Sequence, residues 1–138
     1  MRTGPEPPAD DPEAYLAYNE RVPMTDLTLL SDLVMLEAAI AESRERPVLL
    51  FKHSRFCGVS CEALDEVRSY LERGGSSASG KMITVQSHRD VSDDAARRLG
   101  IRHETPQAIV LRDGRPVWSA SHFRITAAAL ERALSAES

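Results

Sequence analysis

A short apolar run followed by an amphipathic segment is the feature of this sequence that most limits its fold. Residues 48–52 follow a proline and are almost wholly apolar, which is typical of a parallel strand buried on both faces. After this run, apolar residues recur at helical spacing and stop before Gly74-Gly75 (Val59, Ala63, Val67, Tyr70 and Leu71). A buried strand that leads into an amphipathic helix begins a βαβ unit, so the sequence favours an α/β fold.

Strand and helix patterns alternate on both sides of this unit. Further strands are predicted at residues 27–29, 82–86, 108–111 and 116–119, the last two joined by an Asp-Gly turn at 113–114. Further helices are predicted at 33–40, 92–99 and 125–134, with Ser31 and Thr126 as N-caps, Asp93 and Asp94 in a first turn, and Gly100 as a C-terminal stop. Periodicity alone supports a small α/β domain. A cysteine directly after the second predicted strand makes the prediction sharper, and together they favour a thioredoxin-like fold, in which helices flank a mixed sheet made of a parallel half and an antiparallel hairpin.

Proline and acidic residues set the N-terminal segment apart. Five of the eight prolines and five acidic residues fall within residues 1–24, a composition typical of poorly ordered chain. The remaining residues, 25–138, suit one thioredoxin-like domain with a single core. A glycine- and serine-rich run at 74–80 predicts a flexible connection between two elements.

Charge and hydropathy exclude several kinds of partner. The formal net charge of -4 argues against a general nucleic-acid binder, which needs a basic surface. No apolar stretch is long enough to cross a bilayer, and the first residues lack the apolar run of a secretory signal. We therefore expect a cytoplasmic protein with neither nucleic-acid nor membrane partners. In that compartment a closely spaced cysteine pair is more often catalytic or metal-binding than structural.

Cys57 is predicted to lie where the second strand ends and the next helix begins. The helix N-terminus offers unpaired N–H groups and a partial positive charge, and Lys52, His53 and Arg55 add charge or potential charge just upstream. These surroundings favour the thiolate form, which is both the attacking nucleophile and a good leaving group in thiol exchange. The sequence therefore predicts that Cys57 is reactive and takes part in a thiol-transfer cycle.

Two residues that follow Cys57 decide what kind of thiol chemistry is available. Ser60 stands three positions on, where a dithiol motif has its second cysteine, and its hydroxyl can bond the helix end or the Cys57 thiolate. Cys61 lies one helical turn from Cys57, but both Cβ atoms tilt toward the helix N-terminus, which is poor geometry for a disulfide. We expect Cys61 to be packed and nearly structural, and its role as a resolving thiol stays open.

Metal binding is an alternative to thiol chemistry for the two cysteines. His53, Cys57 and Cys61 are spaced by four, but the strand prediction places His53 before the helix and breaks their alignment. One chain also has too few cysteines for an iron–sulfur cluster, although a dimer with external thiols could supply them. We expect no metal site.

A Thr-Pro pair supplies the other side of the candidate site. Thr105-Pro106 precedes a predicted strand and suits a cis bond, which presents backbone groups to an extended partner near Cys57. His103 lies in the same segment. His122 follows the last predicted strand; by itself it is typical of a surface-loop histidine, and it is a further candidate for binding the substrate or the small thiol.

Three ordered segments resemble the YtxJ-type monothiol bacilliredoxins. They are Phe51-Lys52-His53-Ser54, the run from Arg98 to Gln107, and Asp113-Gly114 followed by the run from Val117 to His122. The resemblance covers residues 27 to 134. It implies a thioredoxin-like fold, a cytosolic role in bacteria that use bacillithiol, and removal of bacillithiol from S-thiolated proteins.

The same resemblance assigns roles to three residues. Cys57 matches the active cysteine of the family, Ser60 the serine three positions later, and Pro106 the proline that faces the site. The family usually has proline where this chain has Gly58, and alanine where it has Cys61. Gly58 makes the motif similar also to the Cys-Gly-x-Ser monothiol glutaredoxins, which bind [2Fe–2S] clusters.

These observations predict a thiol-disulfide oxidoreductase. Cys57 would attack the mixed disulfide of a client protein, with bacillithiol as co-substrate and no tightly bound cofactor. Lys52, His53 and Arg55 would stabilise the thiolate or bind an anionic thiol, and Thr105 and Pro106 would position the disulfide. A cluster carrier of the glutaredoxin type and a thioredoxin-fold interaction module without catalysis are the alternatives.

Overall fold

Five strands form one mixed sheet with the order β1-β3-β2-β4-β5. The computed structural model describes residues 27–55, 57–73 and 77–135, so the predicted tail at 1–24 and residues 74–76 of the predicted connection lie outside the described residues. The strands are β1 (Leu27–Leu29), β2 (Val48–His53), β3 (Ser79–Thr84), β4 (Gln107–Arg112) and β5 (Arg115–Ser121). The helices are α2 (Leu33–Glu42), α3 (Gly58–Glu72), α4 (Arg89–Leu99), the 3₁₀ turn η1 (His122–Arg124) and α5 (Ala127–Ser135).

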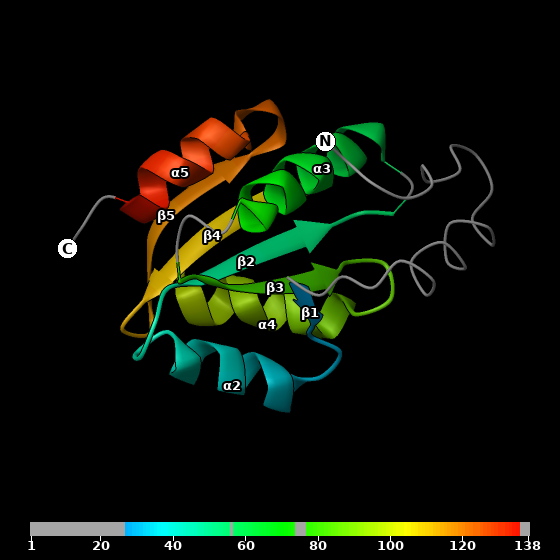
Figure 1. Ribbon diagram of the computed structural model, residues 1–138. Coiled ribbons are helices and arrows are strands. Elements are labelled where there is room, and N and C mark those ends of the chain that lie inside the picture. The colour runs from blue at the N-terminus through cyan, green and yellow to red at the C-terminus, as the bar shows by residue number, and fades with distance from the viewer. Residues whose placement is uncertain (1–26, 56, 74–76, 136–138) are drawn as a thin grey trace.

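Strand directions divide the sheet into two halves. β1, β3 and β2 pair in parallel, whereas β4 pairs antiparallel with both β2 and β5. Helices α2 and α4 cover one face of the sheet, and α3 and α5 cover the other (Figure 1). The prediction of a thioredoxin-like mixed sheet flanked by helices is confirmed.

The central strand β2 supplies the core on both faces. Leu49 and Phe51 pack with α3 and α5, and Val48 and Leu50 pack with α2 and α4. All four side chains are fully buried, which stabilises the fold by about 2 kcal/mol each. Because side chains alternate along a strand, the last two residues of β2 also point to opposite faces, a fact that decides the roles of Lys52 and His53.

Helix ends differ most from the sequence prediction. Asp32, not Ser31, caps α2: its carboxylate accepts a hydrogen bond from the Met35 N–H at 2.8 Å. Helix α4 begins at Arg89, three residues before the predicted start, so Asp90 and not Asp93 or Asp94 lies in its first turn. The first turn of α4 contains a single apolar residue, the buried Val91, and one apolar residue between polar neighbours shows no helical period.

One strand boundary also differs from the prediction, because the strands pair over a longer range than the apolar pattern indicates. β3 spans Ser79–Thr84 instead of residues 82–86, because Ser79 and Gly80 pair with β2 and extend the strand into the predicted flexible connection. The cap at Thr126 is confirmed, since its hydroxyl accepts from the Ala129 N–H at 3.0 Å. The short turn η1 was not predicted.

Candidate functional site

Cys57 is the N-cap residue of α3, at the end of the turn that follows β2. Its backbone N–H donates to the Ser54 carbonyl at 3.3 Å, and its carbonyl accepts from the Cys61 N–H at 3.0 Å. Cys57 is partly exposed, and among the described residues no side chain caps this helix end. The thiol therefore stands at the positive end of a fifteen-residue helix, beside N–H groups that a thiolate can use.

Ser60 ties the first turn of α3 to the end of β2. Its hydroxyl is fully buried, accepts from the Ser54 N–H at 2.9 Å, and lies 2.8 Å from Nδ1 of His53. Two hydrogen bonds thus hold the hydroxyl toward the strand. The observed contacts of Ser60 are structural, and a bond to the Cys57 thiolate stays a prediction.

His53 is buried on the α3 face of the sheet. Its ring stacks on Phe51, with centroids 5.8 Å apart. Burial, together with the smaller effect of the nearby charges of Arg55 and Arg68, lowers the pKa of His53 to about 4. His53 is therefore neutral at physiological pH and does not supply the positive charge that the sequence suggested.

Cys61 points back toward the turn that carries Cys57. Its Sγ lies 3.8 Å from the Arg55 carbonyl, a weak hydrogen bond, and the residue is partly buried. Both cysteines are free thiols. At Gly58, between them, an added Cβ would meet nothing within 4 Å, so space does not explain why glycine stands there.

Gln86, just after β3, makes two side-chain hydrogen bonds to the turn between β2 and Cys57. Its side-chain amide donates to Oγ of Ser54 at 2.5 Å, and its side-chain carbonyl accepts from the Arg55 N–H at 3.3 Å. The role of Gln86 could not be predicted from the sequence, because nothing in its neighbourhood along the chain indicates that β3 ends beside this turn.

The Thr105–Pro106 segment lies beside the end of β2. Lys52 pairs with Gln107, so the two residues before Gln107 run alongside the turn that leads to Cys57. The Thr105–Pro106 peptide bond is cis, as predicted. The His122 N–H donates to the Pro106 carbonyl at 3.1 Å, which attaches η1 to the same segment. The structure thus brings Cys57, Pro106 and His122 to one end of the sheet.

Lys52 lies on the opposite face from His53 and has no exposed surface. Its ammonium donates to the Ser92 carbonyl at 3.0 Å and lies 3.2 Å from Nδ1 of His103. Burial lowers the pKa of Lys52 to about 8, while the nearby Asp93 opposes that change. Lys52 was predicted to act on the thiolate or on an anionic thiol; in the structure its ammonium is held by α4 and His103.

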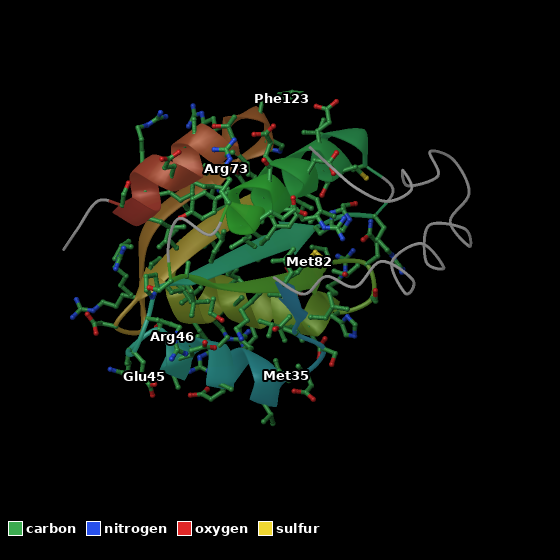
Figure 2. The ribbon with its side chains drawn as sticks, in the orientation of Figure 1. Met35, Glu45, Arg46, Arg73, Met82 and Phe123 are labelled. Atoms are coloured by element: carbon green, nitrogen blue, oxygen red, sulfur yellow. The ribbon has the colours of Figure 1, made fainter. Side chains whose placement is uncertain are left out.

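A pocket of about 310 Å³ opens between α3 and η1. Val59, Ala63 and Ile125 form its apolar part, and Glu62 and His122 are among its polar residues. Phe123 also lines it but is 73% exposed, and Figure 2 shows this side chain at the outer edge of the layer that holds α3 and α5. The pocket begins at Val59, two residues along the chain from Cys57.

Within the described ranges, no three His, Cys, Asp or Glu side chains gather in a way that could hold a metal ion. In the same part of the chain, no helix is long and apolar enough to span a membrane.

The mixed sheet carries a cysteine at a strand-to-helix turn, beside a segment with a cis proline. This arrangement defines a thioredoxin-fold thiol oxidoreductase. The chain belongs to the monothiol bacilliredoxin family: the model described as Monothiol bacilliredoxin BrxC matches residues 28–130. A solved structure described as an oxidoreductase with a thioredoxin fold is 33% identical, with a TM-score of 0.71 over 78% of this chain and 93% of that chain.

More distant structures share the fold alone. Mitochondrial thioredoxin 3 from Saccharomyces cerevisiae is 14% identical, with a TM-score of 0.63 over 80% of this chain and 95% of that chain. Thioredoxin from Fasciola hepatica is 15% identical, with a TM-score of 0.64 over 78% of this chain and 96% of that chain. The fold is therefore kept where most residues differ.

Proposed function

We propose that this protein removes bacillithiol, or a similar low-molecular-weight thiol, from S-thiolated client proteins in the cytoplasm. The observation that carries the proposal is the position of Cys57 as the N-cap of α3, at a helix end that no side chain of the described residues caps. Family membership supports a thiol redox reaction, and the choice of bacillithiol as the small thiol rests on that membership.

The reaction has two exchange steps. In the first, the Cys57 thiolate attacks the small-thiol sulfur of the client mixed disulfide; the old S–S bond breaks and the client leaves as a thiolate that takes up a proton. In the second, another small thiol, as its thiolate, attacks the adduct on Cys57. This step returns the Cys57 thiolate and leaves a disulfide of two small thiols, so the small thiol is the reductant.

Side chains around Cys57 serve this cycle in different ways. The N-terminus of α3 stabilises the thiolate in both steps. In this proposal Thr105 and Pro106 line the approach of the disulfide, and Arg55 and His122 contact the small thiol. Ser60 and His53 hold the turn that carries Cys57.

Replacement of the nucleophile tests the proposal. We expect Cys57→Ser to lose release of bacillithiol from a bacillithiolated peptide, while Cys61→Ala, the matched cysteine variant, retains it. The measurement is mass spectrometry of peptide and protein over time. Full activity of Cys57→Ser would refute the proposal.

The same mass spectra show whether Cys61 acts as a resolving thiol. An adduct on Cys57 that persists until a small thiol is added supports the monothiol cycle. If wild type instead loses its adduct rapidly and gains an internal disulfide, and Cys61→Ala does not, then Cys61 is the resolving thiol and the second step proceeds without an external thiol.

A further inference from the structure

The buried ammonium of Lys52 has no carboxylate partner among the described residues. No acidic side chain in that part of the chain lies within 4.0 Å of it, and its two contacts are the Ser92 carbonyl and the His103 ring. A cation removed from water costs several kcal/mol unless it is paired. The fold therefore keeps this lysine at a cost in stability, which calls for a role other than packing.

His103 extends this contact toward the surface. Since an ammonium can only donate, Nδ1 of His103 accepts from Lys52, and the ring proton of the neutral imidazole then lies on Nε2. Nε2 is 3.2 Å from Oγ1 of Thr105 and donates to it. The hydroxyl hydrogen of Thr105 is thereby left free to be donated to another group. These contacts form a directed chain from Lys52 through His103 to Thr105.

The chain ends at the candidate site. Thr105 precedes Pro106, and this segment runs beside the last residues of β2 and the turn to Cys57. Gln107, the neighbour of Lys52 across the two strands, donates its amide to the Arg102 carbonyl at 3.0 Å and so fixes residues 102–106 against the sheet. Thr105 is partly exposed, so its hydroxyl can meet a bound disulfide.

We propose that Lys52, His103 and Thr105 form a hydrogen-bonded proton relay that protonates the client sulfur as it leaves the mixed disulfide. This inference rests on the proposed function. Thr105 is the residue that would touch the leaving sulfur, and Lys52 and His103 are positioning residues that act through it.

The proton transfer balances the first exchange step. The Thr105 hydroxyl gives its proton to the departing client thiolate, takes one from Nε2 of His103, and His103 takes one at Nδ1 from Lys52. The client leaves as a neutral thiol, Lys52 becomes a neutral amine, and Cys57 loses its negative charge to the new S–S bond. Water then returns a proton to Lys52 through His103, which is exposed.

Acid strength along the relay suits this transfer. Burial lowers the pKa of Lys52 to about 8, close to the value of about 8.5 for an ordinary cysteine thiol. Burial and the charge of Lys52 lower the pKa of His103, which keeps the ring neutral and able to accept. The other charged groups that act on the pair are Asp93 and Arg89 from α4 and Glu104 from the segment before β4.

Two disulfides with different leaving groups test the relay. One is a cysteine peptide carrying bacillithiol, which releases an alkyl thiolate; the other is dithionitrobenzoate, which releases an aryl thiolate too acidic to need a proton. We expect Lys52→Met and Thr105→Val to lower the ratio of peptide rate to aryl rate about tenfold, because general acid assistance is lost. Thr105→Ser keeps the hydroxyl and should restore the ratio.

The pH dependence of this ratio separates the relay from a purely structural role, which would leave it unchanged. Because burial lowers the pKa of Lys52 to about 8, we expect the ratio in wild type to fall as pH rises through that value and the ratio in Lys52→Met to stay constant there. Thr28→Val, the same substitution as Thr105→Val but at an exposed position of β1, is the matched control and should leave the ratio unchanged. Lys52→Met removes a buried charge and is expected to fold.

The relay and the proposed function fail in different ways. An unchanged ratio in Thr105→Val, together with the wild-type pH profile in Lys52→Met, overturns the relay while Cys57 remains the nucleophile. If wild-type protein reacts with neither disulfide at Cys57, the proposed function itself is overturned, and the relay with it.

Discussion

The Ser60 hydroxyl joins the two backbone segments that place Cys57. It accepts from the backbone N–H of Ser54 at the end of β2 and contacts buried His53, while its own residue belongs to the first turn of α3. In a dithiol motif this position carries the second thiol. Here the position holds the turn together, so loss of the hydroxyl should be felt in stability as well as in chemistry.

Ser60→Ala should therefore lower the free energy of unfolding by about 1–3 kcal/mol, because it leaves the partly buried Ser54 N–H and the buried ring nitrogen of His53 without the hydroxyl that they contact. Urea denaturation measures the effect. Ser69→Ala, on a partly exposed position of the same helix, is the control and should change stability by less than about 0.5 kcal/mol. Equal effects from both variants would contradict the buried role of Ser60.

At the scale of elements, the junction between β2 and α3 is the centre of the site, and several other elements hold it. Gln86 comes from the end of β3, the Thr105–Pro106 segment precedes β4, and η1 follows β5. The junction itself could be predicted, since a buried strand and an amphipathic helix flank Cys57. Gln86 and η1 could not, because only the pairing of the strands brings them to the same end of the sheet.

The cap of α2 offers a direct test at this scale. Asp32→Ala should lower the free energy of unfolding by about 1 kcal/mol, since the Met35 N–H loses its acceptor. Ser31→Ala, the neighbouring position that the sequence analysis favoured as the cap, should change it by less than about 0.5 kcal/mol. Denaturant titration of both variants decides the matter, and a larger loss in Ser31→Ala would show that the helix starts one residue earlier.

For the whole molecule, the sheet separates two polar clusters that adjoin in sequence. Lys52 faces the α2 and α4 layer, and His53 faces the α3 and α5 layer. Burial lowers the pKa of both side chains. Each group therefore loses its proton at a lower pH in the folded protein than in the unfolded chain. Stability should accordingly fall as pH falls, over different ranges for the two groups.

His53 affects the free energy of unfolding between about pH 6.5, its ordinary pKa, and about pH 4, its pKa in the folded protein. Over that range the unfolded chain takes up a proton on this ring and the folded chain does not, so the free energy of unfolding falls by about 3 kcal/mol as pH decreases. His103, whose pKa is also lowered, contributes with the same sign. His53→Asn keeps an acceptor for Ser60 but does not titrate, and should flatten the fall. Urea denaturation at several pH values measures this; an identical pH dependence in both proteins would contradict it.

The amino-acid order by itself determined the fold class and the place of Cys57 at a strand-to-helix turn. These follow from local patterns, since burial periodicity and turn residues are written into neighbouring positions. Only the tertiary structure decided what the basic residues before Cys57 do. Adjacent strand residues point to opposite faces, so Lys52 and His53 enter different layers, where burial and distant partners such as Ser92, His103 and Ser60 set their charge.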